Sequence, residues 1–429
     1  MTKRPPLSRT LATLVGASLL TALALPPAAE AATKAPPAPA SAASTPANAV
    51  RPEIAIPLNL AQEKIRAGAF PEALAAVKQA EQVGNFSPFE SYVLTRLRGQ
   101  AAFGTGDLPQ AIKDFDATLA SPLLPAADQQ PMTEALIKVL YNGKEYARAA
   151  TMLRSYQKDG GKDPVVLSLV PSTLYLAGDY AGAAAAMGAQ IDAQVAAGTK
   201  PPEKDLRLLA SAQNNAKDDA GYVATLERLA EAYPKVDYWT ELVARVSGAE
   251  GLADRLHLDA LRLQQATIGH KNASARLQHA YFALRAGYPA EAKPLVDDGL
   301  AQKLFSATDT TEATKLRDQV NKVLAQDKAA AAGNEVAAKA SKDGDALVSL
   351  GLEMVFDGQI DKGLALMDQG LAKGGLKRPD DARLHLGVAQ FRAGKLDEAR
   401  KSFDAVQGSD GTRMLAHLWS LFAKIGGKL

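Results

Sequence analysis

The histidines are the first side chains to consider for chemistry, because the sequence contains five of them and no cysteine. Imidazole and thiolate groups bind zinc when they recur at set spacings along a helix or loop. None of the histidines here stands in such a motif with a second histidine or a carboxylate. The sequence therefore predicts no metal site and no cofactor. The five are His257, His270, His279, His385 and His417.

Two other motifs could carry chemistry. Gly104-Thr105-Gly106 is followed by Asp107 and lacks the Lys and Ser/Thr of a phosphate-binding loop. Glu90-Ser91 opens a helix-like stretch and is similar to the Glu-Ser at the catalytic acid of exported transglycosylases. Those enzymes also need a separate catalytic domain with a Gly-rich signature, which is missing here. An acid at a helix start is favoured by the helix dipole, so we predict that Glu90 is structural and that the protein is not an enzyme.

A repeated pattern dominates the rest of the sequence. It consists of a turn residue, an apolar or aromatic residue two positions on, a small residue five on and a large apolar residue nine on. The copies recur at intervals of 34 to 38 residues or near multiples of them, which indicates a stack of helix pairs without a single central core. The turn positions are Gly68, Gly106, Lys144, Gly178, Gly287, Gly358 and Gly394.

The residue types in this pattern have physical reasons. Glycine at the turn permits a left-handed backbone, which costs little only without a Cβ atom. The small residue five on allows two helices to cross closely, and the large residue nine on fills the space between neighbouring pairs. Apolar residues at three- and four-residue spacings before each turn predict one apolar face per helix.

The stretches 350–371 and 386–403 carry the pattern most fully, with Leu-Gly in the first helix and an aromatic or apolar residue before the turn. In these features the chain resembles the tetratricopeptide-repeat family, specifically an exported bacterial member. The resemblance covers residues 54 to 406 and departs from the family at Lys144 and Pro289. It implies an all-α, right-handed superhelical solenoid of antiparallel helix pairs, with about ten repeats.

The resemblance also implies where a ligand would bind, because first-helix positions line the concave groove in this family. An aromatic series interleaved with polar groups there could hold an extended peptide or a partner helix. Alternatively, the aromatic residues serve only for packing within their repeats. The candidate groove residues are Phe103, Tyr141, Tyr175, Tyr281, Phe391, Arg96, Gln100 and Lys138.

The N-terminus has the pattern of a secretory signal peptide at residues 1–31, with a basic start, a short apolar run from Leu11 to Leu25 and a small-x-small end at Ala29–Ala31. An uncleaved anchor is the alternative. Residues 32–53 are rich in Pro and Ala and predict a disordered linker. We expect a periplasmic or secreted protein with no transmembrane segment after cleavage.

Charge and composition limit the partners. The formal net charge is +2, and residues 1–31 carry a net +2, so the mature chain is neutral. A neutral chain offers no electrostatic surface for nucleic acid. The absence of cysteine excludes a disulfide and a lipid-modified N-terminal cysteine.

The remaining segments complete the predicted organisation: repeats at 54–326, an irregular Ala-rich joint at 327–344, further repeats at 345–406 and a terminal apolar helix at 407–429. Segment 327–344 could be a flexible joint or a loosely packed helix. The terminal helix could fold onto the preceding repeat or form a contact with a second copy or another partner. Its candidate interface residues are Leu418, Trp419 and Phe422.

Together these features predict a non-enzymatic periplasmic scaffold that binds a protein partner through a peptide or helix in the groove, within an envelope assembly or export complex. The alternative is an accessory protein that binds cell-wall material or exopolysaccharide on its aromatic series. The sequence does not identify the partner.

Overall fold

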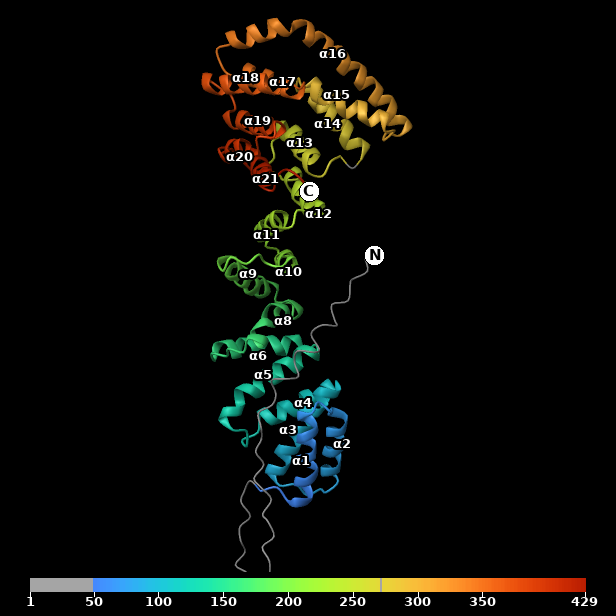
Figure 1. Ribbon diagram of the computed structural model, residues 1–429, viewed down its shortest axis with the longest axis vertical. Helices are drawn as coiled ribbons and strands as arrows, with labels where there is room; N and C mark the ends of the chain where they lie inside the picture. The colour runs from blue at the N-terminus through green and yellow to red at the C-terminus, as the bar shows by residue number, and fades with distance from the viewer. Residues whose placement is uncertain (1–48, 271) are drawn as a thin grey trace, which may run out of the picture. The chain divides into compact units, whose positions relative to one another are not determined.

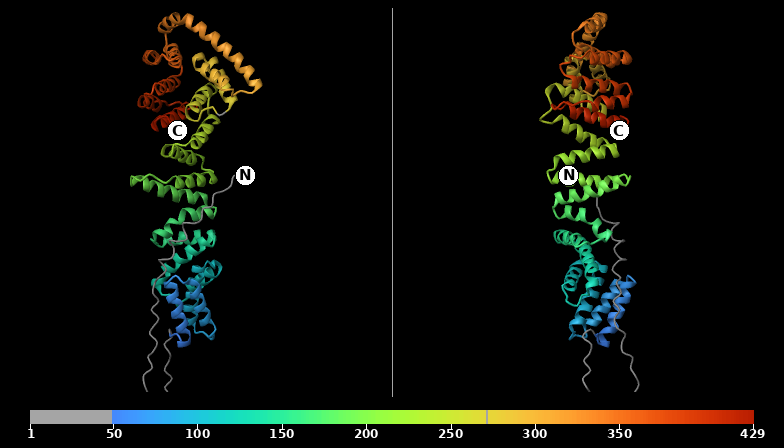
Figure 2. Two further views of the ribbon diagram at one scale, coloured as in Figure 1. Left: turned by 45° about the vertical axis from the view of Figure 1, so that its right-hand side comes forward. Right: turned by 90° about the vertical axis from the view of Figure 1, so that its left-hand side faces the viewer.

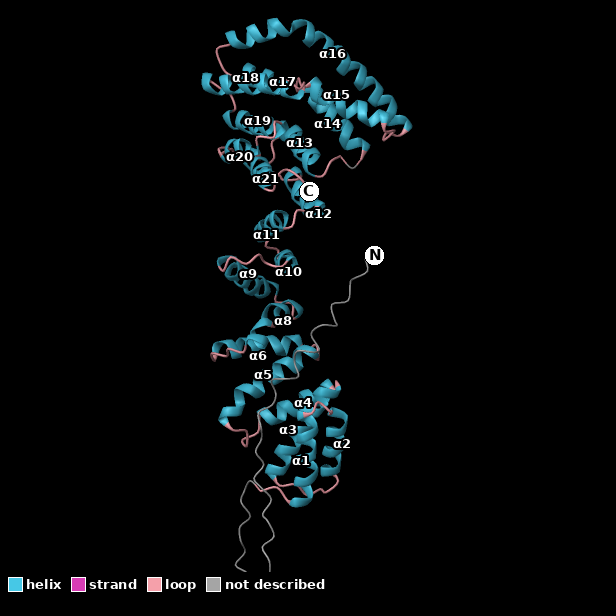
Figure 3. Ribbon diagram, viewed as in Figure 1, coloured by secondary structure: helices cyan, strands magenta, loops and turns pink. Residues whose placement is uncertain are grey.

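The computed structural model describes residues 49–270 and 272–429 (Figure 1). In this part of the chain all regular structure is helical, comprising 21 α-helices and one short 3₁₀ helix at Asp254–Leu256 (Figure 3). The fold class predicted from the repeats is therefore confirmed. The predicted signal peptide and residues 32–48 of the predicted linker lie outside the described residues.

The chain divides into two compact units, Met1–Gln190 (unit 1) and Ile191–Leu429 (unit 2), with the boundary inside α9 (Tyr180–Ala196). In unit 1 consecutive helices pack as pairs, α1 with α2, α3 with α4 and α5 with α6 (Figure 2). The other helices of unit 1 are α1 (Pro52–Arg66), α2 (Phe70–Glu81), α3 (Pro88–Thr105), α4 (Leu108–Leu119), α5 (Ala126–Asn142), α6 (Tyr146–Lys158), α7 (Pro164–Ser168) and α8 (Val170–Leu176).

The turn residues have the backbone conformation that their pattern predicted. All seven have positive φ, for example 84° at Gly106 and 62° at Lys144. Lys144 thus occupies a left-handed position that ordinarily favours glycine. The amide nitrogen of Gly106 donates to the carbonyl oxygen of Phe103, which closes the helix before it.

Small residues bring the paired helices together, as the pattern also predicted. In the pair formed by α17 (Asp345–Phe356) and α18 (Ile360–Lys373), a Cβ atom on Gly351 would lie 2.5 Å from the carbonyl oxygen of Gly363. The two backbones therefore touch with no side chain between them. The large residue nine positions after the turn, such as Phe115 or Met367, is fully buried.

Unit 2 contains three pairs with the same arrangement, α10 with α11, α14 with α15 and α19 with α20, in addition to α17 with α18. Its helices are α10 (Glu203–Asn215), α11 (Asp219–Ala232), α12 (Val236–Ser247), α13 (His257–Thr267), α14 (Ala273–Arg285), α15 (Pro289–Ala301), α16 (Ala307–Ala340), α17, α18, α19 (Pro379–Arg392), α20 (Leu396–Asp404) and α21 (Thr412–Lys424).

For most of segment 327–344 the structure favours the loosely packed helix over the irregular joint, and only residues 341–344 form bends. Residues 327–340 form the second half of α16, a continuous helix of 34 residues. Its apolar contacts are concentrated at Ala313, Leu316 and Val320 in the first half, with Ala338 near the end. Alanine has the highest helix propensity, which explains why the sparsely packed second half is still helical.

Six helices of unit 2 form a closed helical ring. They are α13, α14, α15, α17, α19 and α21; each contacts the next, and α21 returns to contact α13. Figure 1 shows the last helices, α19 to α21 in red, beside α13 in yellow-green. The repeat array in this unit thus ends by packing against its own earlier helices.

The closure buries the apolar face of α21, so the predicted interface residues are not available to a second copy. Leu418, Trp419 and Phe422 are 2%, 2% and 1% exposed within the single chain. The ring of Phe422 packs edge-on against Trp239 at 5.1 Å, and Trp419 stacks on Phe403. The apolar stripe that suggested an interface is the surface with which α21 joins α19, α20 and α13.

Ion pairs reinforce the same closure. Arg255 forms a bidentate pair with Asp381, with nitrogen–oxygen distances of 2.7 and 2.8 Å, and also bonds Asp410 at 2.5 Å. His385 lies 3.1 Å from Asp259, and His417 lies 3.0 Å from Glu227. These contacts join residues more than a hundred positions apart in the sequence.

Candidate functional site

The aromatic residues predicted for a groove pack mainly within their own repeats. The ring of Tyr141 meets Tyr146 edge-on at 5.7 Å, and Tyr175 meets Tyr180 in the same way at 5.3 Å. Phe103 packs against the hydrophobic core of unit 1. Each is half-buried. This geometry favours the packing interpretation of these three residues.

Two of the predicted polar groove residues link successive repeats. Arg96 is buried and donates to Asp128 at 2.9 Å, and Lys138 is buried and donates to Asp163 at 3.1 Å. Gln100 is half-buried in α3. Paired and buried cations of this kind hold neighbouring helices together and are poor candidates for ligand contacts.

Six of the eight predicted groove residues belong to unit 1, and only Tyr281 and Phe391 belong to unit 2. Tyr281 is 47% exposed, with the guanidinium of Arg285 centred 5.6 Å from its ring. Phe391 lines a cavity together with residues that the sequence did not single out as a binding site.

Glu90 is a structural residue, as the sequence indicated. Its carboxylate accepts a hydrogen bond from the Ser87 amide at 2.8 Å, while the Ser87 hydroxyl accepts from the Glu90 amide at 3.1 Å, which forms a capping box on α3. Burial favours its neutral form, but bonds from Arg51 and Ser87 outweigh burial and hold the pKa of Glu90 at about 2. An ionised carboxylate cannot donate a proton as a catalytic acid.

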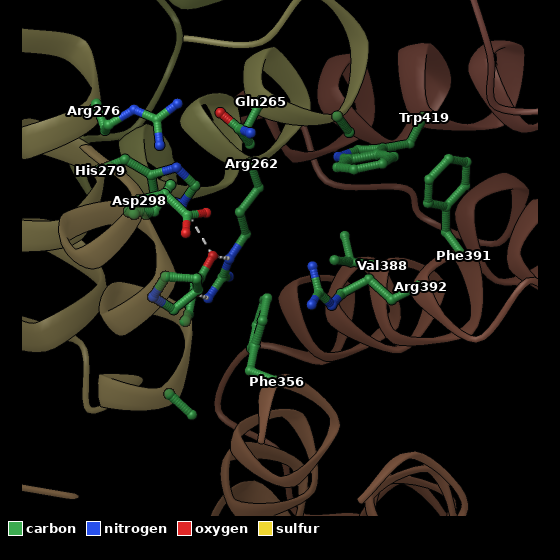
Figure 4. Close-up of a pocket in the computed structure, with 15 residues that line it drawn as sticks. Arg262, Gln265, Arg276, His279, Asp298, Phe356, Val388, Phe391, Arg392 and Trp419 are labelled. Atoms are coloured by element: carbon green, nitrogen blue, oxygen red, sulfur yellow. Dashed lines mark hydrogen bonds and ion pairs between the residues drawn. The ribbon is translucent and has the colours of Figure 1, made fainter. Parts of the chain in front are cut away.

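The candidate site is an open cavity of about 580 Å³ lined by the helices of the ring (Figure 4). All six helices of the ring contribute to its wall. The phenylalanine and tryptophan side chains of the lining lie on the α17–α21 wall, which in Figure 4 faces the α13–α15 wall across the opening. The lining residues used below are Arg262, Arg276, Glu291, Asp298, Phe356, Phe391, Arg392 and Trp419.

A buried ion network forms the floor of this cavity. Arg262 donates to both carboxylate oxygens of Glu291 at 2.9 and 2.7 Å, and to Asp259 at 2.8 Å. All three side chains are at most 4% exposed. Burial alone would raise the pKa of each acid. At Asp259 the interactions with His385 and Arg262 lower the pKa by more than burial raises it, and at Glu291 the interaction with Arg262 does the same. The pKa of each acid is therefore about 2.

Two histidines extend the network. The Nε2 atom of His279 lies 3.0 Å from Glu291, and its Nδ1 atom lies 2.7 Å from Nε2 of His270. Burial and the neighbouring His279 lower the pKa of His270 to about 4. His270 is therefore neutral at pH 7. Among the described residues no group of three or more His, Asp or Glu side chains could hold a metal ion.

The opposite wall carries donors without protein acceptors. Arg392 forms no hydrogen bond or salt bridge with any described residue, and its guanidinium lies 4.5 Å from the centre of the Phe356 ring. Burial and Arg262 hold the pKa of Arg392 below its usual range, although Glu291 acts in the other direction. The indole Nε1 of Trp419 is buried without an acceptor in the described chain. In Figure 4 this nitrogen faces the cavity.

The network escaped sequence interpretation because its members are distant in the chain. Asp259 and His385 are 126 residues apart, and Arg262 and Glu291 are 29 residues apart. Arg262 engages both buried acids of the network, Asp259 and Glu291.

A separate carboxyl group, Glu353, makes this unit sensitive to pH. It accepts a hydrogen bond from the Ala290 amide at 3.0 Å, and its other oxygen has no partner among the described residues. Burial raises the pKa of Glu353 to about 7, and nearby Glu291 and Asp327 add to the shift, against the Ala290 bond. The folded state therefore binds a proton more tightly than the unfolded state, whose carboxyl has an ordinary pKa of 4.5.

We predict that this proton stabilises unit 2 at low pH. The contribution is present below pH 4.5 and is lost as the pH rises to about 7. The free energy of unfolding should fall between pH 5 and 8 by about 1–3 kcal/mol more in the wild type than in Glu353→Gln. Urea unfolding followed by tryptophan fluorescence measures this, because both tryptophans, Trp239 and Trp419, belong to unit 2. Equal pH dependence in the two proteins would contradict it.

Comparison with known proteins identifies the repeats. One family model described as tetratricopeptide repeat matches residues 58–125, 96–164 and 348–412, and a second with the same description matches 206–235. These matches lie in both units. No curated protein matches the sequence at a significant level.

Solved structures similar to the chain include other helical repeat proteins. Yeast Tom70 has a TM-score of 0.23 and 11% identity, covering 87% of this chain and 96% of that one. The P58(IPK) TPR domain has a TM-score of 0.23 and 13% identity, covering 86% and 98%. Naa15/Naa10 bound to HypK-THB has a TM-score of 0.24 and 14% identity, covering 81% and 62%. With scores this low, the family assignment depends on the repeat models.

Proposed function

The chain is a tetratricopeptide-repeat protein, a class that typically serves as a scaffold for protein–protein interaction, and we propose that it binds a segment of its partner in the cavity of the helical ring. The observation that carries this proposal is the wall formed by α17, α19 and α21. It presents Arg392 and the Trp419 indole nitrogen toward the cavity without protein acceptors. The Trp419 nitrogen is buried, and a buried donor without an acceptor is costly. The Arg392 side chain is exposed, and a bound chain can supply acceptors to both.

The ion network supports binding by giving the site a fixed shape. Arg262 holds Asp259 and Glu291 with short bonds, and His385 ties Asp259 to α19. A preorganised site loses less conformational entropy when a ligand binds. The cavity volume of about 580 Å³ lies within the range of ordinary ligand pockets and suits a short peptide segment.

The protein works, in this proposal, in the periplasm as part of an envelope assembly or export complex. The support is the secretory pattern of residues 1–31 and the Pro/Ala-rich stretch that follows. Within the described residues, no helix combines the length and apolarity needed to cross a membrane. N-terminal sequencing of the protein from the periplasmic fraction should begin at Ala32, directly after the small-x-small site. Recovery of an intact N-terminus in the cytoplasm would refute export.

Site-specific crosslinking tests the binding proposal. A photoreactive residue in place of Gln265, which is exposed and lines the cavity, is compared with one in place of Gln302, which is also exposed and follows α15 outside the cavity. We expect discrete protein adducts in native envelopes from position 265 and not from 302. Identical adducts from both positions, or none, would refute the cavity as the binding site. Adducts that a glycan hydrolase removes would favour the exopolysaccharide alternative.

A further inference from the structure

Two junctions close the helical ring between its walls. At the first, Arg255 beside α13 forms charged pairs with Asp381 of α19 and with Asp410, just before α21. At the second, between α15 and α17, the Ala290 amide donates to a carboxylate oxygen of Glu353 at 3.0 Å. Among the described residues no ion pair joins α15 to α17, so the two junctions differ in their electrostatics.

The carboxyl group at the second junction is surrounded by other acids. One oxygen of Glu353 is buried and has no partner among the described residues. Burial raises the pKa of Glu353 to about 7, and Glu291 of α15, Asp327 of α16 and Asp357, directly after α17, add to the shift against the Ala290 bond. When Glu353 is ionised, it is therefore repelled by an acid on each of the two neighbouring helices, α15 and α16.

No cation offsets this repulsion at Glu353. Arg262 from α13 and Arg392 from α19 lie against the Phe356 ring, 5.2 and 4.5 Å from its centre, and neither donates to the carboxylate. Lys362 of α18 pairs with an acid of α16. In the described chain a single backbone amide is the donor to this group, so its ionised form is poorly compensated.

The helix α16 connects the two sides of this junction. It follows α15 in the chain, ends shortly before α17 and lies over both of them in Figures 1 and 2. In its second half the one buried residue is Ala338. A segment with few buried contacts resists displacement weakly, so α15 and α17 can separate while α16 still links them.

We propose that the contact between α15 and α17 is a proton-controlled junction of the helical ring, closed when Glu353 is neutral and open when Glu353 is ionised. Opening at this point widens the cavity, because Ala290 and Glu291 line it from α15 and Phe356 lines it from α17. The inference concerns the protein alone and does not rest on the proposed function.

The size of the effect follows from the proton affinity of the two states. In the open junction the Glu353 carboxyl is solvated and has its ordinary pKa of 4.5, whereas the closed junction raises the pKa to about 7. The ratio of open to closed molecules therefore rises by up to about a hundredfold between about pH 5 and about pH 8.5.

The test uses spin labels in the full-length protein, whose sequence contains no other cysteine. The reporter pair is Ala286→Cys with Gln359→Cys, two exposed positions in the turns before α15 and after α17. The control pair is Gln265→Cys with Arg413→Cys, exposed positions in α13 and α21 across the first junction. Electron paramagnetic resonance at about pH 5 and about pH 8.5 gives the label-to-label distances.

We expect a more distant population of the reporter pair at the higher pH and no change in the control pair. Glu353→Gln removes the ionisable group and should keep the closed distances at both pH values. Asp327→Asn removes the like charge on α16 and should reduce the change, which keeps the proposal testable even if Glu353→Gln does not fold. Asp368→Asn, an exposed acid on α18, is the matched control and should behave like the wild type.

Three outcomes overturn the proposal. Identical reporter distances at the two pH values in the wild type would show that the junction does not respond to protons. The same change in Glu353→Gln would assign the response to another group. A change of the control pair together with the reporter pair would mean that the whole ring loosens, including the contact of His385 with Asp259, and not the α15–α17 junction alone.

Discussion

Arg262→Met is expected to lower the free energy of unfolding of unit 2 by about 3–5 kcal/mol. The arginine side chain is 3% exposed and is the only cation other than histidine bonded to Asp259 and Glu291 among the described residues. Its removal leaves two buried carboxylates poorly compensated. Urea unfolding of the full chain, followed by the fluorescence of the two tryptophans in unit 2, measures the change.

Two comparisons make this result specific. Adding Asp259→Asn and Glu291→Gln to Arg262→Met removes the buried negative charges and should restore a large part of the lost stability. Arg228→Gln breaks an exposed pair with Asp192 and should cost less than about 1 kcal/mol. A loss below 1 kcal/mol in Arg262→Met, or a triple variant no more stable than the single one, would show that the network does not hold the helical ring together.

Phe422→Ala should destabilise unit 2 by about 3–5 kcal/mol. Phe422 is 1% exposed and contacts both Trp239 of α12 and Phe391 of α19, so the cavity left by its removal lies at the junction where α21 closes the helical ring. The Trp239 emission of the folded protein should shift to the red as water reaches the junction. Urea unfolding gives the free energy.

The matched control is Met414→Ala on the same helix. Met414 is 39% exposed, so its truncation should change stability by less than about 1 kcal/mol. Equal effects of the two substitutions would mean that the burial of α21 contributes little. If the wild type were a dimer and Phe422→Ala a monomer at the same concentration, the result would instead support the contact between copies that the sequence suggested.

Much of the local architecture could be predicted because it depends on neighbours in the sequence. The positive φ at Gly106 and the close approach at Gly351 follow from residue types within one repeat. For segment 327–344 the sequence left a flexible joint and a loosely packed helix open, because its small side chains resemble a linker although their helix propensity is high. The apolar stripe of α21 was recognised in the sequence. Such a stripe indicates that the helix packs against an apolar surface, but not whether that surface belongs to the same chain or to another.

The site itself depends on contacts that a repeat pattern does not encode. The helical ring brings Asp259 beside His385, which is 126 positions away, and Arg255 beside Asp410, which is 155 positions away. The periodicity of a repeat array describes how each helix pair packs on the next pair. It does not indicate which helices far apart in the sequence contact each other. For the same reason the sequence indicated Phe391 only as an aromatic residue of its own repeat. It did not indicate the residues of other helices that line the cavity together with Phe391.

The closure of the helical ring constrains how this gene can change. An open array of helix pairs tolerates the duplication or loss of a repeat, because each new pair only needs an end to stack on. Insertion of one more pair between α13 and α21 would separate Trp239 from Phe422 and Arg255 from Asp381. Repeat number is therefore free to drift in an open array, but in residues 257–424 it is fixed by geometry, and variation there must proceed by substitution.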